Sequence, residues 1–436
     1  MKFALPIAFA ILIPQINFFT NNYFLGKLGE TELGLAGITG VYYLVFAVIG
    51  NGFNNGLQSI LSRFAGAENR MQLGRYVSQA LKLVLITALL GILFTYSIAP
   101  AMFRHEIQNH HALDLALKFN LIRILGLPFL YMYQIGNSFL ISTNHTRFLV
   151  IGTLAEAATN IFLDYTLIFG HFGATALGFT GAAYASIGAE IMGMIVVHAF
   201  LFFKGITTDY KVFSHIKWDS KAALQLLDRS APLIFQYFIS VGSWLLFYFW
   251  VGHLGTRSMA ISNTMRNVFG LFGIIGWAMA STTNNMVSNL IGQDRKEEVM
   301  DLVKRVCTIN FMYAVLFIIV LNFRPAFYFH FFDQDPGFIQ DGIPSLHMVS
   351  LALLFMSQGV VWLNALSGTG QTRINLLIEF ICVTIYIIYV YLAVMVYRMP
   401  LVYAWGSEIL YWSIMLGGAI FYFRFFDWKA RIKEVQ

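Results

Sequence analysis

Long stretches of apolar residues, separated by short polar segments, recur along the whole chain. Residues 3–26 and 33–62 contain no charged side chain, and similar stretches occur at 83–103, 124–146, 232–251 and 342–372. A helix needs about 20 such residues to cross the hydrocarbon core of a bilayer. Because these stretches are continuous and do not alternate with polar residues, the pattern predicts membrane-spanning helices and not the strands of a β-barrel.

The polar segments divide the chain into about twelve predicted spans. They lie at 5–26, 34–60, 78–103, 117–142, 148–170, 178–203, 231–252, 258–287, 306–324, 344–367, 375–397 and 401–423. In 436 residues this plan leaves no room for a soluble domain. We therefore expect an all-α, multi-pass protein whose main solvent is the lipid bilayer.

Composition and charge agree with this expectation. The chain is 58% hydrophobic and 11% charged, whereas soluble domains are about a quarter charged, so soluble enzymes and nucleic-acid binders are excluded. The net charge of +6 reflects topology, because about 20 of the 28 basic residues fall on one side of the predicted spans. The positive-inside rule makes that side cytoplasmic, together with both termini and the polar segment 204–230.

The two halves of the chain repeat each other at a fixed offset of 226 residues. Sparse identities recur without a gap over more than a hundred positions, among them Pro6 with Pro232, GKLG at 26–29 with GHLG at 252–255, and Thr146 with Thr372. The repeat predicts two six-helix lobes, 1–203 and 231–436, joined by a cytoplasmic linker at 204–230. Six helices per repeat give both lobes the same orientation, a parallel plan that many secondary transporters share.

Several segments resemble one known family. These are LPIAFAILIPQINFFTNNYFLGKLGE and ATNIFLDYTLIFG in the first half, and SNLIGQDRKEEV and NALSGTGQTR in the second. Together they are similar to the multidrug and toxic compound extrusion (MATE) transporters, in order and spacing along nearly the whole chain. The resemblance implies a monomeric exporter, not an enzyme, in a bacterial-type cytoplasmic (inner) membrane. It implies antiport of organic, cationic or amphiphilic compounds against H⁺ or Na⁺ by alternating access, with no cofactor besides the coupling ion.

Polar residues inside the predicted spans mark a candidate ion site, because ionisable groups are costly in a membrane. Glu156, Asn160 and Asp164 recur every four residues and share one face of the helix at 148–170. Counted from the outer helix ends, Asn21, Asp164 and Ser186 lie at similar depths. Their oxygens could bind Na⁺, chiefly at Asp164 and Asn160, or surround a carboxyl group that carries a proton.

The resemblance assigns roles to the same residues. Asn160 and Asp164 match the family's N-x-x-x-D pair, and Ser186 falls where the family carries threonine. Asn21 departs from the pattern, because it falls where the first helix of the family carries an essential aspartate. An amide cannot titrate, so either Asp164 alone carries the coupling charge or the coupling is weakened or altered. The structural alternative is that these residues only join helices, at about 0.6 kcal/mol per contact.

Other intramembrane carboxylates leave alternatives open. Glu156 and Glu190 are possible ion or substrate contacts. Glu156 lies nearer the cytoplasmic end of its helix. Glu190 lies mid-membrane, where it could attract a cationic substrate or form a hydrogen bond inside its lobe. Glu379, six residues after Arg373, is expected near the membrane interface.

Two rival functions are weighed against export. A flippase for a lipid-linked saccharide shares the two-lobe plan but needs a strongly basic cavity, and only Arg123 and Arg266 lie well inside predicted spans. An intramembrane transferase needs a catalytic group near a helix end. The His- and acid-rich segment 105–114 is its only candidate, and we expect that segment to be a solvated connection without a metal.

Overall fold

The computed structural model describes residues 4–107, 109–214, 217–329 and 336–432. These residues form helices joined by short turns, and no β-strand occurs among them. Ten of the described helical segments are long and apolar enough to span a membrane, which confirms the multi-pass, all-α prediction. By its internal contacts the chain separates into two compact units, Met1–Ile234 and Phe235–Gln436.

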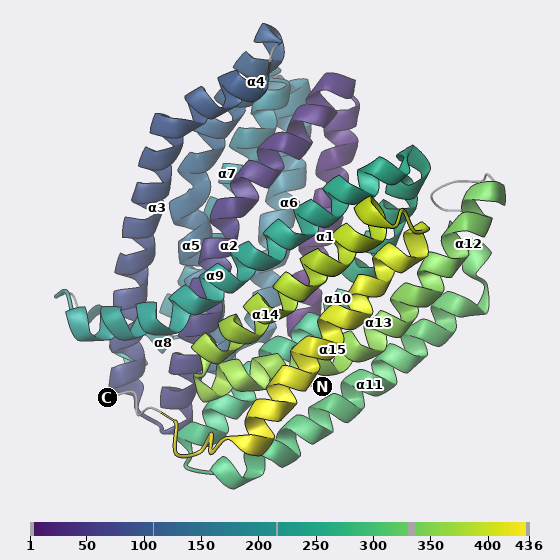
Figure 1. The fold of residues 1–436 in the computed structure, drawn as a ribbon. Helices are drawn as coiled ribbons and strands as arrows, with labels where there is room; N and C mark the ends of the chain where they lie inside the picture. The colour runs from purple at the N-terminus through teal and green to yellow at the C-terminus, as the bar shows by residue number, and fades with distance from the viewer. Residues whose placement is uncertain (1–3, 108, 215–216, 330–335, 433–436) are drawn as a thin grey trace. The chain divides into compact units, whose positions relative to one another are not determined.

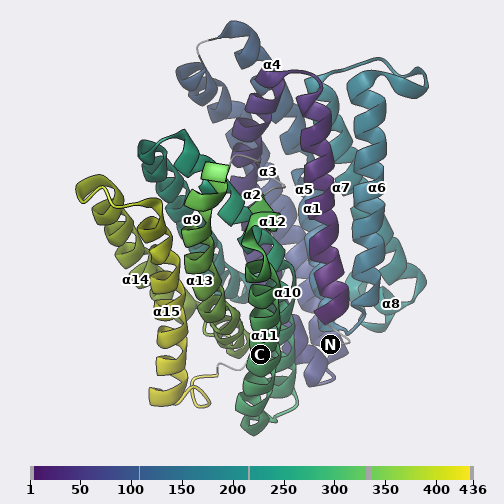
Figure 2. The same ribbon diagram turned by 90° about the vertical axis from the view of Figure 1, so that its right-hand side faces the viewer.

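In the first unit the described residues form eight α-helices and the start of a ninth. They are α1 (Ala4–Gly26), α2 (Glu30–Gly66), α3 (Arg70–Glu106), α4 (His110–Arg123), α5 (Leu127–Ser142), α6 (Arg147–Phe169), α7 (Phe179–Phe203), α8 (Ile206–Asp209) and the first turns of α9 (Ser220–Val251). Helix α6 packs on α1 and α7, and α5 packs on α2, α3 and α7. Figures 1 and 2 both show α1 beside α6. The candidate site residues therefore come from neighbouring helices.

The second unit holds the remainder of α9 and the following helices. They are α10 (Thr256–Gly292), α11 (Val299–Phe323), α12 (Pro325–Phe329), α13 (Pro336–Thr369), α14 (Thr372–Tyr391) and α15 (Leu401–Phe425). Helix α13 packs on α10, α11 and α15. The most apolar part of α13 is 61% buried, more than that of any other candidate span among the described residues. It is therefore the central helix of this unit.

The backbone repeats at the offset that the sequence predicts. Four pairs of residues with positive φ stand 226 positions apart: Gly29 (φ 155°) with Gly255 (φ 99°), Glu68 (54°) with Asp294 (60°), Asn144 (63°) with Gly370 (85°), and Phe172 (55°) with Arg398 (48°). The paired helices α2 and α10 both have 37 residues. Since a positive φ is uncommon outside glycine, its recurrence shows that the two halves share these turns.

The fourth predicted span differs between the halves. In the first unit it is broken into α4 and α5 by a 3₁₀ turn, Ile124–Gly126, whereas α13 is continuous. Pro128 stands in the first turn of α5, where its missing N–H costs no helical hydrogen bond. At the equivalent position in α13 the residue is Leu354. The proline therefore accounts for a break on one side only.

The start of α9 also differs from the prediction. The helix begins at Ser220, eleven residues before the predicted span, so much of the segment expected as a linker is helical. Ala222 and Leu226 are buried, whereas Lys221 and Leu224 are exposed. This extension is amphipathic, and a search for continuous apolar stretches does not detect an amphipathic helix.

Candidate functional site

The polar residues of α1 and α6 meet inside the first unit. The side-chain amide of Asn21 donates a hydrogen bond from Nδ2 to Oδ2 of Asp164, over 3.0 Å. Nearly one turn further along α1, the ring of Phe24 contacts that of Phe169 on α6, with centroids 5.8 Å apart. From the first contact to the second, the residue numbers increase along both helices, so α1 and α6 run parallel. The structure thus brings Asn21 and Asp164 together, as their depths predicted.

Polar atoms on these two helices are buried without hydrogen-bond partners among the described residues. They are Oδ1 of Asp164, Nδ2 of Asn160 and Oδ1 of Asn17. Asp164 is completely buried and Asn160 is 3% exposed. Asn17 and Asn160 each lie one turn before Asn21 and Asp164, so these amides share one level. Because buried polar groups are normally paired, this cluster has hydrogen-bonding and ligand capacity to spare.

The other residues that the sequence proposed for the ion site, Ser186 and Glu156, do not take part in the Asn21–Asp164 contact. Ser186 is half-buried on α7, and no hydrogen bond links it to Asp164 or Asn160 in the described part of the chain. Glu156 lies two turns before Asp164. It faces Gly193 of α7 closely, since a Cβ atom at Gly193 would lie 3.3 Å from the Cβ of Glu156. The candidate cluster is therefore narrower than the sequence predicted.

Glu190 forms a buried ion pair within the same unit. Arg123, the last residue of α4, donates to both carboxylate oxygens, from Nη1 to Oε2 over 2.9 Å and from Nη2 to Oε1 over 2.6 Å. The Tyr43 hydroxyl of α2 donates to Oε1 over 2.9 Å. The Arg123 guanidinium also lies 3.6 Å from the centre of the Tyr43 ring. Glu190 was predicted either to attract a cationic substrate or to form a hydrogen bond inside its lobe, and these contacts favour the second role.

The break between α4 and α5 makes room for this pair. Gly126 lies in the 3₁₀ turn, and a Cβ at this position would lie 2.3 Å from Oε2 of Glu190 and 2.8 Å from Nη1 of Arg123. A side chain at this position would have to displace the ends of Glu190 and Arg123 from their ion pair. Sequence reasoning singled out both charged residues but did not pair them, because they are 67 positions apart.

A model of the MatE family matches this chain twice. The matched residues are 6–166 and 232–392, which together make up more than half of the sequence and begin 226 positions apart. The chain belongs to the MATE family. This confirms the resemblance, and the chain is therefore a transporter and not an enzyme.

Relatives of this MATE transporter are found among bacterial proteins. It is 23% identical over 322 residues to the probable multidrug resistance protein NorM of Synechocystis sp., covering 73% of this chain and 68% of that protein. It is 24% identical over 404 residues to the protein of the same name from Listeria monocytogenes, covering 86% and 84%. The similarity thus extends through both halves.

Solved structures agree on the fold of the MATE transporter. An outward-facing multidrug resistance MATE transporter of the MOP superfamily has a TM-score of 0.88 at 16% identity, covering 99% of this chain and 94% of that one. A MOP superfamily transporter from Pyrococcus furiosus has a TM-score of 0.87, also at 16% identity, with the same coverage. At this identity the likeness shows the fold alone.

The second unit of the MATE transporter holds two buried carboxylates of its own. Glu379, which the sequence predicts to lie near the membrane interface, is completely buried in α14. Three side chains donate hydrogen bonds to it: Gln236 over 3.3 Å, Ser240 over 2.5 Å and Tyr411 over 2.7 Å. Glu408 of α15 is 3% exposed and accepts from the Tyr386 hydroxyl over 3.3 Å. The donors to Glu379 come from α9 and α15, so the spacing of residues along the sequence gave no signal for this cluster.

The rival intramembrane transferase has its only candidate in the segment 105–114. No group of three or more His, Cys, Asp or Glu side chains among the described residues could hold a metal ion. Cys307 and Cys382 are buried free thiols. Membership of a transporter family already excludes that rival.

Proposed function

We propose that this MATE transporter exports organic compounds across a bacterial-type inner membrane, coupled to inward H⁺ or Na⁺ through Asp164. The observation that carries the proposal is the Asn21–Asp164 contact, in which a fully buried carboxylate has one neutral donor and one oxygen without a described partner. A buried carboxylate without a fixed cation can bind a proton or a metal cation and release it when water enters. The multidrug resistance relatives support the organic substrate class.

Asn21 and Asn160 fit the role of ligands to a mobile cation. An amide oxygen is a hard, neutral ligand of the kind that Na⁺ and other oxygen-binding cations accept. Rotation of the Asn21 amide would present Oδ1 where Nδ2 now donates. Asn21 in place of the family aspartate leaves a single carboxylate at the contact, so we infer that Asp164 carries one coupling charge.

The second unit provides an internal comparison. The positions 226 residues after Asn21, Glu156, Asn160 and Asp164 are Phe247, Cys382, Tyr386 and Val390, all buried and none a carboxylate. The carboxylates of that unit, Glu379 and Glu408, occupy other positions, and Glu379 is surrounded by hydrogen-bond donors. The asymmetry supports coupling in the first unit.

The flippase alternative is weakened by the Arg123–Glu190 pair. A pyrophosphate headgroup needs basic side chains that are available for binding. Arg123, one of the two deep basic residues, already binds both oxygens of Glu190. We propose that this arginine stabilises the lobe.

The direct test replaces Asp164 by asparagine. Asp164→Asn keeps the side-chain shape and removes the charge, so we expect loss of gradient-driven dye efflux with normal membrane insertion, because removing an intramembrane charge lowers the cost of insertion. Efflux would be measured in vesicles under separate ΔpH and Na⁺ gradients, which also identifies the ion.

Val390→Asn is the matched control. It adds an amide at the equivalent buried position of α14 and should leave the ion dependence unchanged. If Asp164→Asn exported dye at the parent rate under either gradient, the coupling site would be wrong. Glu156 and Glu379 would then be the next residues to replace.

A further inference from the structure

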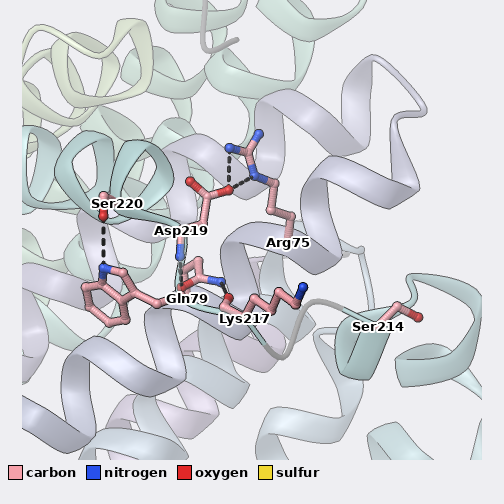
Figure 3. Close-up of a pocket in the computed structure, with 7 residues that line it drawn as sticks. Arg75, Gln79, Ser214, Lys217, Asp219 and Ser220 are labelled. Atoms are coloured by element: carbon pink, nitrogen blue, oxygen red, sulfur yellow. Dashed lines mark hydrogen bonds and ion pairs between the residues drawn. The ribbon is translucent and has the colours of Figure 1, made fainter.

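A polar pocket lies at one end of the first unit, where the N-terminal turns of α3 and α9 meet. Its volume is about 580 Å³, and its lining includes Arg75 and Gln79 of α3 with Lys217, Trp218 and Asp219 before α9. Figure 3 shows the Lys217 side chain extending away from the Arg75–Asp219 pair. The end of α3 that carries Arg75 is the basic side of the protein, which the sequence predicts to face the cytoplasm.

Both oxygens of the Asp219 carboxylate in this pocket have partners within the protein. Oδ1 of Asp219 accepts the backbone N–H of Ala222, and Oδ2 lies 2.5 Å from both Nε and Nη2 of Arg75. The Ala222 N–H, and then Arg75, lower the pKa of Asp219, so the pair is charged at neutral pH and adds no net charge.

The remaining charge of the pocket is positive. No carboxylate pairs with the Lys217 amine in the part of the chain that the structure describes. Lys82 adds a second ammonium group at the same place, because its Nζ donates to the backbone oxygen of Lys217 over 2.9 Å. Lys217 lines the pocket and Lys82 contacts the Lys217 backbone beside it, so two ammonium groups lie at or next to the pocket.

Apolar side chains continue from the edge of the pocket along α9. Trp218 is 50% exposed, and Leu224 and Leu227 are 66% and 36% exposed. The two leucines are three residues apart and share one face of the helix. Leu224 lies four residues, or about 6 Å, beyond Ser220. A cationic pocket with a tryptophan at its edge and an apolar path beside it matches a phosphate headgroup and an acyl chain.

We propose that this pocket binds an anionic phospholipid, with the phosphate between Lys217 and Lys82 and an acyl chain along Leu224 and Leu227. Anionic headgroups are enriched in the cytoplasmic leaflet and attract basic residues near the surface. The second unit lacks the same charges, because Asp301 and Thr308 stand 226 residues after Arg75 and Lys82. The site is therefore specific to the first unit and is distinct from the coupling site at Asp164.

Lipid titration of the purified full-length protein, followed by native mass spectrometry, tests this site. Phosphatidylglycerol should bind the parent about five-fold more tightly than it binds Lys217→Gln, the change expected for one basic residue near a charged surface. Phosphatidylcholine should bind both proteins equally. Lys304→Gln removes an exposed lysine from α11 and is the matched control, which should keep the parent affinity.

A second measurement locates the lipid. Phosphatidylglycerol with brominated acyl chains should quench a fluorescence component of the parent that Trp218→Phe lacks. Equal phosphatidylglycerol binding by the parent and Lys217→Gln would overturn the proposal. Displacement of the lipid by inorganic phosphate alone, at matched concentrations, would also overturn it and indicate a site for small anions.

Discussion

At the scale of single residues, the neighbours of each buried carboxylate determine what it can do. Asp164 has a neutral amide as its hydrogen-bond donor, whereas Glu190 has the Arg123 guanidinium. A fixed cation stabilises a buried negative charge at the cost of exchange with other cations. We therefore expect Asp164 to exchange its cation and Glu190 to keep its arginine, although both carboxylates lie in one unit.

Removing Glu190 should destabilise the first unit. Glu190→Gln leaves the Arg123 charge buried without its partner, which costs about 3–5 kcal/mol in comparable pairs. We expect a clear fall in the thermal unfolding temperature of the purified protein, and Arg123→Leu combined with Glu190→Gln should recover much of it. If the two substitutions lowered stability additively, the pair would not be coupled as its geometry implies.

At the scale of elements, the start of α9 depends on Asp219. This residue accepts the Ala222 N–H as an N-terminal cap and also binds Arg75 of α3. A charged cap is favourable at a helix N-terminus, where N–H groups lack partners. Asp219 therefore anchors the amphipathic extension that the apolar pattern did not reveal.

Neutralising Asp219 should have an effect that depends on pH. Its folded-state pKa is lowered, so the stability it provides is present above its unfolded pKa of about 3.9 and is lost as the pH falls through the folded value. Asp219→Asn keeps the cap oxygen and removes the charge. We expect it to be less stable than the parent at pH 7 by about 0.5–1 kcal/mol, because the ion pair is partly exposed. The difference in unfolding temperature should shrink as the pH falls below the unfolded value and through the lowered folded-state pKa, and a gap that does not shrink on acidification would contradict this account.

At the scale of the whole molecule, the distribution of charge predicts the orientation in the membrane. Basic residues gather at the segment around Ser214, and the rule that such segments stay inside applies most strongly to short loops. The two native cysteines are buried, at 8% and 0% exposure. A cysteine added at the surface would therefore report its own location.

Ser214→Cys tests the orientation. It should resist membrane-impermeant thiol reagents in intact cells and react in inverted vesicles. His110→Cys, at an exposed position in the predicted outer connection, should show the opposite pattern. Labelling of Ser214→Cys from outside would reverse the predicted topology.

The fold was largely predictable because it depends on local patterns. Membrane helices need long apolar stretches, and the repeat appeared as paired positions such as Pro6 and Pro232. The boundary of α9 was missed because polar and charged residues, among them Lys221, Asp228 and Arg229, interrupt the apolar residues of its first turns. The break before α5 was missed because a proline in the first turn of a helix is compatible with a continuous apolar stretch.

The sequence by itself determined the class of the protein, the twofold repeat and the position of Asn21 opposite Asp164, because all three follow from hydropathy and from counting along helices. Only the tertiary structure decided which charges are paired. Arg123 with Glu190, the donors around Glu379, and Asp219 with Arg75 join residues distant in the chain. Side-chain pairing depends on helix rotation and packing within about 3 Å, and neither is set by the spacing of residues along one helix.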